Sequence, residues 1–317
     1  MSPQGRPKGE FRKAAHPLVW VFLVLALLAG CQSVPPMTRQ ASSAEGLALL
    51  QASAAAHGLA AFEQVDDISV AYDSHWYTIV SRLQPTLVDK GYRGGSQERL
   101  LLRDGLVAQR HEGPAGTKYV VRERDPDDPA SSRRIDVRFD GKVSDDPGQR
   151  DAAALVADAY RIFLLGPLAF VRGGQVVDDL GAVSLGGRLT DRLLINSRPG
   201  IGASAQDRIL LFIDRQDRLV RRIRFTLEGL DSTRGAVVEV DTEDHVRLHG
   251  IAWPTRFFER LLRPVPYLPA HRWSLLALDI NRGLQPRDVR NGQFSGAAAA
   301  PARPLAPFEN KAWPPAS

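Results

Sequence analysis

The chain has 317 residues, a formal net charge of +5 and a single cysteine. Residues 1–30 contain four basic residues and one acidic residue, so the remainder carries a net charge of only about +2. Nucleic-acid binding needs concentrated basic charge, and this balance argues against it. The length allows a substantial core in one domain, and no period of 20–50 residues suggests a solenoid or propeller.

The first thirty residues have the three zones of a secretory signal segment. A basic start precedes an apolar run from Leu18 to Ala29, and small residues lead to Cys31. A spanning helix needs about twenty apolar residues, and this run is shorter, so a permanent transmembrane helix is the weaker alternative. The sequence therefore predicts a signal peptide over residues 1–30.

Leu28-Ala29-Gly30-Cys31 resembles the lipobox of bacterial lipoproteins. The resemblance implies that a signal peptidase recognises Leu28, Ala29 and Gly30, that Cys31 carries lipid on its sulfur, and that acyl chains anchor the protein to a membrane. The alternative, an ordinary secreted protein, would leave an unpaired thiol at Cys31 in an oxidising compartment. Gln32 replaces the Asp that commonly retains lipoproteins at the inner membrane, which implies the periplasmic face of the outer membrane.

The next elements are a tether, a helix and a long strand. Residues 31–43 contain two prolines and are predicted to be a tether. Ser42 or Ser43 caps a helix over Ala44–His57 that Gly58 ends, with His57 expected as a cation at the helix terminus. From Asp66 to Arg82 apolar residues alternate, which predicts one strand with an apolar face.

Two Asp-Gly pairs between apolar runs predict hairpins, at Asp104-Gly105 and at Asp140-Gly141. The acidic segment 125–129 lacks the glycine and distal Glu of a calcium loop and is predicted to be a turn.

Asp151 to Leu165 returns to a helical period, and Gly166-Pro167 ends the helix. The stretch from Phe163 to Val171 is the most hydrophobic after the signal segment. It either borders an apolar cavity or belongs to an ordinary core.

Residues 176–280 are predicted to form nearly continuous strands. The candidate strands are 176–180, 188–195, 208–214, 219–228, 236–241, 246–258 and 272–280. Spacings near ten residues favour an antiparallel meander that curls toward a barrel. Arg221, Arg222 and Arg224 are the densest basic cluster, and their alternation favours a solvated sheet face over a phosphate site. The Ala- and Pro-rich residues 283–317 are predicted to be a disordered tail, with Trp313 near its end.

The motifs tested for chemistry give no catalytic residue, metal site or cofactor site. Gly200–Ala205 superficially matches a dinucleotide fingerprint, but a strand rather than a helix is predicted after it. His245 and His249 lack a His-Glu-x-x-His context, so a surface turn is the better interpretation. The pairs Asp145-Asp146 and Asp178-Asp179 are adjacent, which on a strand points them to opposite faces. The protein is therefore not expected to be an enzyme.

Taken in order, features over residues 44–282 resemble the lipoprotein-carrier superfamily (LolA/LolB-like domains). These are the helix before Gly58, the strand bearing Trp76, the segment 163–170, the hairpin 213–221 and the motif 249–254. The resemblance implies a mainly β fold with some α, in which a curved antiparallel sheet forms a half-open barrel closed by helices. It implies that the concave face holds acyl chains of a lipid or lipoprotein cargo.

Eight residues are candidates to line that cavity, with ordinary core packing as the alternative for each: Ile68, Tyr72, Trp76, Phe163, Phe170, Ile223, Phe225 and Trp253. Three functions remain open. A lipid- or lipoprotein-binding protein predicts a continuous apolar cavity. An interaction or sensor module for an envelope transporter or regulator predicts a filled core and an exposed apolar patch. A hydrolase predicts a polar cleft with perturbed pKa values.

Overall fold

The structure is a computed structural model that describes residues 33–124 and 134–305. The chain divides into two compact units, Met1–Ser33 and Val34–Ser317, and the fold described here is that of the second. The lipobox with Cys31, the acidic segment 125–129 and Trp313 lie outside the described residues.

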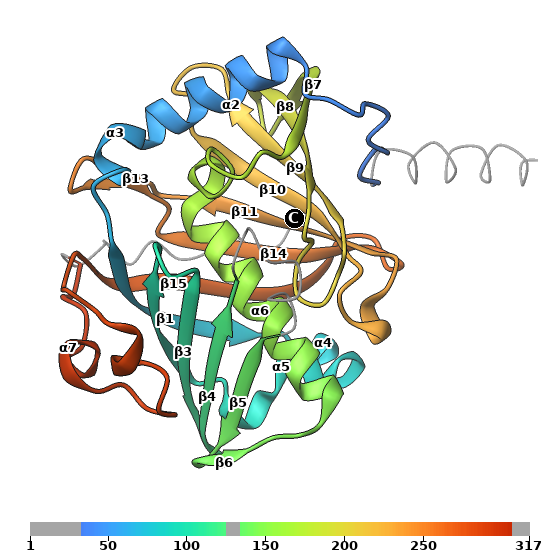
Figure 1. The fold of residues 1–317 in the computed structure, drawn as a ribbon. Coiled ribbons are helices and arrows are strands. Elements are labelled where there is room, and N and C mark those ends of the chain that lie inside the picture. Colours follow the sequence, from blue (N-terminus) through green and yellow to red (C-terminus); the bar gives the residue numbers. More distant parts are fainter. Residues whose placement is uncertain (1–32, 125–133, 306–317) are drawn as a thin grey trace, which may run out of the picture. The chain divides into compact units, whose positions relative to one another are not determined.

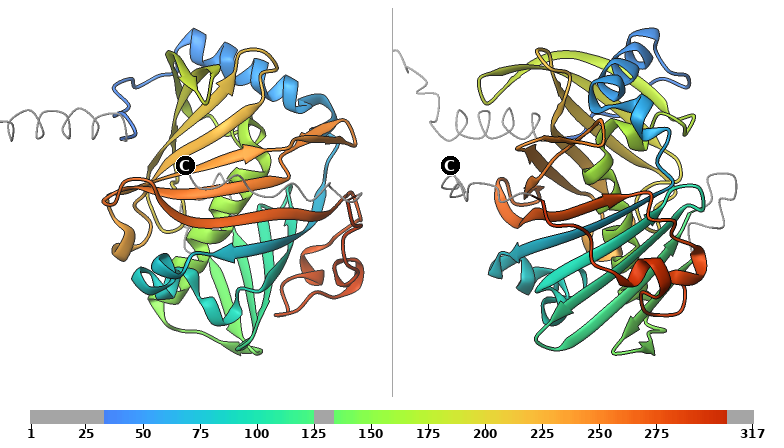
Figure 2. Two further views of the ribbon diagram at one scale, coloured as in Figure 1. Left: turned by 180° about the vertical axis from the view of Figure 1, so that it is seen from behind. Right: turned by 90° about the vertical axis from the view of Figure 1, so that its left-hand side faces the viewer.

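A single curved antiparallel sheet of 13 strands dominates the fold and does not close into a barrel (Figures 1 and 2). Its strands run in the order β6-β5-β4-β3-β2-β1-β15-β14-β11-β10-β9-β8-β7. Their bounds are β1 Asp67–Trp76, β2 Gly95–Leu101, β3 Leu106–Gly113, β4 Gly116–Glu123, β5 Ile135–Phe139, β6 Lys142–Val143, β7 Val176–Leu185, β8 Arg188–Ser197, β9 Asp207–Asp214, β10 Val220–Leu227, β11 Ala236–Glu243, β14 Arg256–Arg263 and β15 Leu268–Ile280. The predicted fold class is confirmed.

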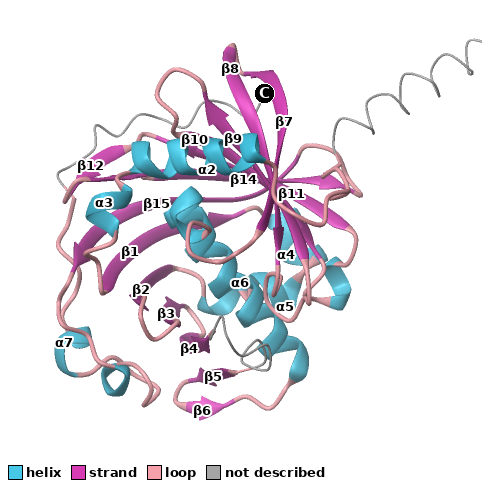
Figure 3. Ribbon diagram, turned by 45° about the horizontal axis from the view of Figure 1, so that its top comes forward, coloured by secondary structure: helices cyan, strands magenta, loops and turns pink. Residues whose placement is uncertain are grey.

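Helix α6 (Pro147–Leu165) and the turn η3 (Gly166–Ala169) connect β6 and β7, which are the two edge strands of the sheet. To join opposite edges the chain crosses the concave face, and Figure 3 shows the sheet curving around α6. The helix therefore occupies the inside of the half-barrel.

The remaining elements are short apart from α2, which lies over β7, β8 and β13 at one end of the sheet (Figure 1). They are α2 (Ala44–His57), α3 (Leu59–Phe62), α4 (Thr78–Leu83), α5 (Pro85–Val88), η1 (Lys90–Tyr92), η4 (Asp231–Thr233), the ribbon β12 (Val246–Leu248) and β13 (Ile251–Trp253), η5 (Pro286–Asp288) and α7 (Gly296–Ala299). The bounds predicted for α2 are confirmed: the Ser43 hydroxyl accepts a hydrogen bond from Gly46 N, and Gly58 adopts φ +97°.

The main core lies between α6, α2 and the concave face, and smaller apolar clusters lie on the convex face. Val34 packs there against β8, β9, β11 and β14. Val34, inside the segment predicted to be a tether, is thus packed in the folded unit.

Three segments differ from the sequence-based expectation. The strand expected over 66–82 ends at Trp76, Tyr77 N–H still donates to Ala270 O of β15, and α4 begins at Thr78. Residues 246–258 divide into β12, β13 and the start of β14.

The third segment is 283–305, expected to be disordered. It folds over the convex face of β2–β4, where Leu284, Val289 and Ala298 are buried. Tyr119 Oη donates a hydrogen bond to Val289 O at 2.5 Å, which adds a specific contact to this burial. A few apolar anchors are enough to order an Ala-rich segment when a sheet face is ready to receive them.

Candidate functional site

Helix α6 covers the concave face, and its sequence explains why it is internal. The Asp146 carboxylate caps it by accepting a hydrogen bond from Gln149 N at 2.7 Å, with Pro147 in the first turn. Nearly every residue from Ala152 to Leu165 is buried. A helix that is apolar on almost all sides belongs in an interior, so α6 fills the half-barrel.

Asp158 fixes the middle of α6 to the sheet. Its Oδ2 accepts hydrogen bonds from Arg122 Nη2 and Arg124 Nη1, both at 3.0 Å, and from Gly202 N at 2.9 Å. Arg122 and Asp158 are almost fully buried, so the pair is sensitive to loss of either partner. Gly202 lies in a loop that leads into β9, which agrees with the rejection of a dinucleotide fingerprint at Gly200–Ala205.

Seven of the eight candidate cavity residues lie in the main core, each at most 5% exposed: Ile68, Tyr72, Phe163, Phe170, Ile223, Phe225 and Trp253. The Phe163 ring lies 5.4 Å from that of Phe225 and 5.5 Å from that of Trp273, between centroids. Trp76 lies apart at the end of β1, in a smaller cluster with Val80. The side chains of α6 occupy the face that a ligand chain would otherwise contact.

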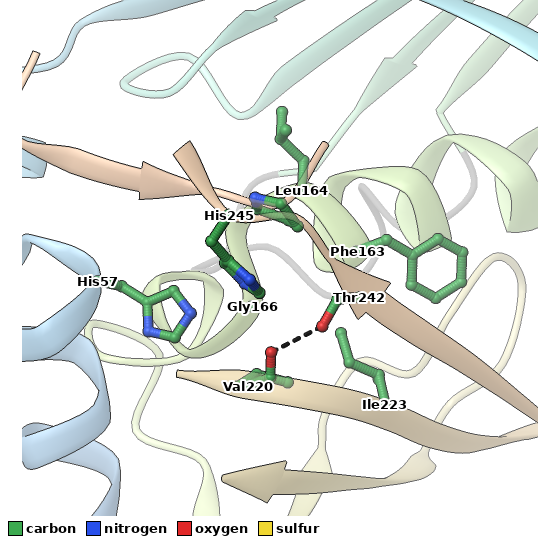
Figure 4. Close-up of a pocket in the computed structure, with 9 residues that line it drawn as sticks. His57, Phe163, Leu164, Gly166, Val220, Ile223, Thr242 and His245 are labelled. Atoms are coloured by element: carbon green, nitrogen blue, oxygen red, sulfur yellow. Dashed lines mark hydrogen bonds between the residues drawn. The ribbon is translucent and has the colours of Figure 1, made fainter. Parts of the chain in front are cut away.

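A narrow hollow, partly open to solvent, lies at the C-terminal end of α6 (Figure 4). Its lining residues are His57, Phe163, Leu164, Gly166, Val220, Ile223, Thr242, His245 and Pro254. Phe163 and Ile223 thus border both this hollow and the main core. The gap between these side chains is too narrow to hold even a water molecule, so an acyl chain could enter here only if side chains or the end of α6 moved.

Two histidines distant in sequence meet at this hollow. The rings of His57 and His245 lie edge to face with centroids 5.9 Å apart. His57 Nδ1 is 2.9 Å from Ser53 O, which can only accept, so Nδ1 carries the proton. Burial lowers the pKa of His57 to about 4 and that of His245 to about 3. His57 is therefore neutral at pH 7, and the predicted helix-terminal cation is wrong.

The other half of the concave face, over β1–β4, is polar. Glu98 lies opposite Gln109 and His111 opposite Lys118 in the strand register, and all four are at most 1% exposed. Glu98 lies two residues before the core residue Leu100 on β2 and therefore shares its face of the sheet. The side chains of Glu98 and its neighbours in this row thus point to the α6 side. Charged and amide groups at such positions need partners.

Part of this polar row is internally satisfied. Gln109 Nε2 donates to Glu98 Oε1 at 2.7 Å, and Lys118 Nζ donates to Asp89 Oδ2 at 2.8 Å. Burial raises the pKa of Glu98 to about 8, so the carboxyl is largely protonated at neutral pH. Lys118 is thus already neutralised by Asp89, and Glu98 contributes little charge.

Arg93 lies beside this row and is only 9% exposed. Its guanidinium carbon is 5.9 Å from the centroid of the Trp76 ring, and its Nε has no hydrogen-bond partner. In the part of the chain that the structure describes, no carboxylate oxygen lies within 4.0 Å of its guanidinium. Burial shifts the pKa of Glu98, His111, Glu259 and His271 most strongly, and the charge of Arg93 lowers the pKa of each.

His271 forms the opposite side of the same region. Its ring stacks on Trp76 at 4.0 Å and on Trp273 at 4.6 Å, and its Nδ1 lies 3.4 Å from Tyr160 Oη of α6. Burial lowers the pKa of His271 well below its usual value and raises that of Glu259 to about 8. Burial thus favours the neutral form of two imidazoles, His111 and His271, and of two carboxyls, Glu98 and Glu259.

We call this region the concave polar cluster: Trp76, Arg93, Glu98, Gln109, His111, Tyr160, Glu259 and His271. Ten buried side-chain N or O atoms lack a partner among the described residues, and five of them belong to this cluster. Four are nitrogens that can donate, at Trp76, Arg93, His111 and His271. An unsatisfied buried polar group costs about 1–3 kcal/mol, so these atoms need partners that the described residues do not supply.

The convex face carries a contrasting cluster around the arginines singled out in the sequence. Arg222, Arg224 and Arg260 all contact Glu239, the last at 2.7 Å from Nε to Oε1. Arg222 and Arg260 also pair with Asp241. Arg222 and Arg224 lie on a sheet face, as the alternation on β10 predicted, but at 19% and 13% exposure they are paired with carboxylates and not solvated. Arg221 pairs separately with Asp214 and Asp217.

Within residues 33–124 and 134–305, no group of three or more His, Cys, Asp or Glu side chains is placed to hold a metal. In the same ranges one helical stretch, Pro147–Ala169, is long and apolar enough to cross a membrane, but its apolar window is 89% buried in the fold. That burial is the property of a core helix.

Sequence reasoning missed both the His57–His245 contact and the concave polar cluster. A usable signal existed for the cluster: Glu98 shares its parity with Leu100, and His111 shares its parity with Val107. Polar residues on the apolar parity of adjacent strands indicate a buried polar site. Arg93 precedes β2 and follows no periodic pattern, so only the fold brings it there.

No protein-family model matches the chain, and no curated protein sequence matches it. Solved structures with a similar fold include a domain from Vibrio parahaemolyticus described as an outer membrane lipoprotein-sorting protein (9% identity, 78% of this chain and 96% of that chain, TM-score 0.41). A LolA superfamily protein from Nitrosomonas europaea is 10% identical, and the match covers 74% of this chain and 97% of that chain with a TM-score of 0.42.

A DUF1329 family protein from Desulfovibrio piger gives 10% identity, 78% and 96% coverage and a TM-score of 0.47. The superfamily that the sequence resembles is thus among these structures. The likeness concerns the fold, and nothing about what this chain binds follows from it.

Proposed function

We propose that this chain is a lipid-anchored protein of the bacterial cell envelope that binds an acyl chain of a lipid or lipoprotein between α6 and the concave face. The lipobox resemblance at Leu28–Cys31 supports the anchor and the periplasmic face of the outer membrane as its location. The sequence beyond the signal segment supports a domain over 44–282, to which the structure adds the packed residues 283–305.

The observation that carries the binding role is the continuity between the hollow and the concave face. Phe163 lines the hollow and also contacts Trp273 and Phe225. Because apolar contact is not directional, an acyl chain that displaces the last turns of α6 would retain the burial of these rings. Ile68, Tyr72, Phe170, Ile223 and Trp253 extend the proposed lining, while Trp76 belongs to its polar end.

The first experiment is native mass spectrometry of the full chain purified in detergent from a bacterial envelope, with lipid extraction in parallel. The intact mass reports lipidation of Cys31, for which Cys31→Ser is the control. We expect a stoichiometric non-covalent lipid or acylated peptide in addition to the anchor. A protein free of such a ligand across several expression conditions would contradict acyl-chain binding.

Substitutions along the proposed lining test where the ligand binds. Phe163→Glu introduces a charge where the hollow meets the core, and we expect it to abolish loading. Ile223→Trp adds apolar volume beside the hollow without adding charge, and we expect loading to fall, with urea denaturation measuring the cost of overpacking. Leu276→Glu, at a position that is 50% exposed, is the matched control and leaves loading unchanged.

A second candidate is an interaction or sensor module for an envelope transporter or regulator, without a lipid ligand. The packing of α6 against the concave face favours it, as do the exposed apolar residues Ile79 and Leu83 on α4, at 51% and 57% exposure. A clean unliganded mass, combined with a protein partner that is lost in Ile79→Ser/Leu83→Ser, would establish this alternative.

A further inference from the structure

The turn between β14 and β15 presents apolar side chains to solvent. Residues 263–267 are all exposed, with Val265 at 45% and Tyr267 at 62%. Tyr267 adopts φ +56°, a backbone region that bulky side chains rarely occupy. Neither burial in the core nor the geometry of the turn therefore accounts for a tyrosine at this position.

Helix α4 adds two exposed apolar side chains beside this turn. Its residue Val80 lies in one apolar cluster with Leu268 and Ala270 of β15, which follow the turn directly. Ile79 and Leu83 point away from that cluster into solvent, and Figures 1 and 2 show α4 and the turn at the same end of the sheet. Four of the eight large apolar side chains that are exposed among the described residues thus lie on these two elements. Such a concentration is typical of an interaction surface.

The charged side chains around this surface favour an anionic partner. Arg82 on α4 and Arg263 at the start of the turn are exposed, and in residues 33–124 and 134–305 no carboxylate lies within 4.0 Å of either guanidinium. The adjoining β10–β11 turn, which Gln84 contacts, carries Asp231, but Asp231 pairs with Arg234. Two positive charges therefore flank the apolar side chains.

The position of Val34 brings the proposed lipid anchor to the same end of the sheet. Val34 O accepts a hydrogen bond from Arg208 Nη1 at 2.9 Å, and the Val34 side chain shares an apolar cluster with Val237. Val237 lies opposite Arg263 in the strand register, so Val34 is close to the first residue of the turn. Only two residues separate Val34 from Cys31, and an extended chain of three residues spans at most about 11 Å. Lipid on Cys31 would hold the membrane near this turn.

We propose that the β14–β15 turn and α4 form the surface with which the anchored protein contacts a phospholipid membrane. Val265 and Tyr267 enter the boundary between head groups and acyl chains, where apolar side chains and tyrosine are favoured. Arg82 and Arg263 contact the lipid phosphates. This inference rests on the proposed lipid anchor and adds a fixed orientation of the fold on the membrane.

The single cysteine of the chain makes a site-specific test possible. In the lipidated full chain Cys31 carries the lipid, so a cysteine introduced at another position is the one free thiol and accepts an environment-sensitive fluorophore. Labelled Val265→Cys is reconstituted into phospholipid vesicles that contain spin-labelled lipids as quenchers. The matched control is labelled Leu189→Cys, which is 51% exposed and lies near the start of β8, at the other end of the sheet.

We expect the label at position 265 to emit at shorter wavelength and to be quenched several-fold more than the label at position 189. Adding Tyr267→Ser should reduce this quenching because it removes the second side chain that enters the membrane. Arg82→Gln/Arg263→Gln should reduce it in vesicles of anionic lipid and leave it unchanged in vesicles of zwitterionic lipid.

Intact mass and flotation with the vesicles measure the anchor separately. A lipidated protein that floats, but whose two labels are quenched equally, would overturn the membrane contact and leave the anchor in place. Emission at shorter wavelength that the lipid quenchers do not reduce would assign the surface to a protein partner and would also overturn the membrane contact. An unmodified Cys31 would overturn the anchor, and this inference with it.

Discussion

Two clusters of charged side chains lie on opposite faces of the same sheet. On the convex face, Glu239 is 0% exposed and receives three guanidiniums. On the concave face, Arg93 and Glu98 are similarly buried, yet no ion pair joins them. Burial alone raises the pKa of Glu239, but the three arginines hold it below its usual value, whereas burial raises that of Glu98 to about 8.

The difference lies in how each cluster meets its buried charge. Removing one partner of a buried ion pair leaves the other charge uncompensated and costs about 3–5 kcal/mol. The convex cluster joins β10, β11 and β14 through paired charges, whereas the concave polar cluster has donors without a partner among the described residues.

The largest expected effect comes from breaking the paired cluster. Glu239→Ala leaves Arg222, Arg224 and Arg260 without their shared carboxylate, and we expect it to lower the free energy of unfolding by about 3–5 kcal/mol. Urea denaturation at pH 7 measures this. A loss below about 1 kcal/mol would show that the convex cluster does not stabilise the sheet.

A second prediction concerns pH. The folded pKa of Glu98, about 8, lies above its unfolded value, so the folded state keeps a proton that the unfolded state releases. The stability that this proton confers is complete below about pH 4.5 and is lost as the pH rises toward 8. Glu98→Gln should therefore gain a few kcal/mol relative to the parent between pH 5 and 8.

Urea denaturation of both proteins at pH 5, 6, 7 and 8 gives the comparison. Parallel stability profiles for parent and Glu98→Gln would contradict the expected proton uptake. Glu63→Gln, at an exposed position, is the matched control and should run parallel to the parent.

The third prediction is that replacing the buried arginine Arg93 does not lower the free energy of unfolding. Arg93→Met removes an unpaired buried charge and keeps much of the side-chain volume, so the free energy of unfolding should stay unchanged or rise by up to about 2 kcal/mol. Thermal and urea unfolding of the ligand-free protein measure it. A loss above about 1 kcal/mol would mean that Arg93 is a structural residue.

The smallest effect is expected for an exposed pair. Asp231→Ala breaks the contact between Asp231, whose side chain is 92% exposed, and Arg234, whose side chain is 66% exposed. It should change the free energy of unfolding by less than about 0.5 kcal/mol. The same urea titration sets the baseline against which Glu239→Ala is judged. A change as large as that of Glu239→Ala would remove the distinction between buried and exposed pairs.

The sequence predicted what depends on local chemistry. Ser43 and Gly58 delimit α2, and alternation identifies β10 with its outward arginines. It could not predict what depends on pairing across the sheet. Thr78, Ile79 and Val80 have strand propensity but form α4, although β15 continues beyond the partner of Trp76. The concave polar cluster combines residues of β1, β2, β3, α6, β14 and β15 with Arg93, and only the tertiary fold brings them together.

The position of β1 has a consequence for how the protein forms. β1 pairs with β2 on one side and with β15 on the other, so Ile68 lies opposite Ile280. The centre of the sheet is thus a seam between the beginning and the end of the domain. Meanders such as β2–β5 and β7–β11 can assemble from neighbours in sequence, but the seam closes only after more than 200 residues are available. Until then β1 presents an unpaired edge, which makes late closure the step most exposed to aggregation.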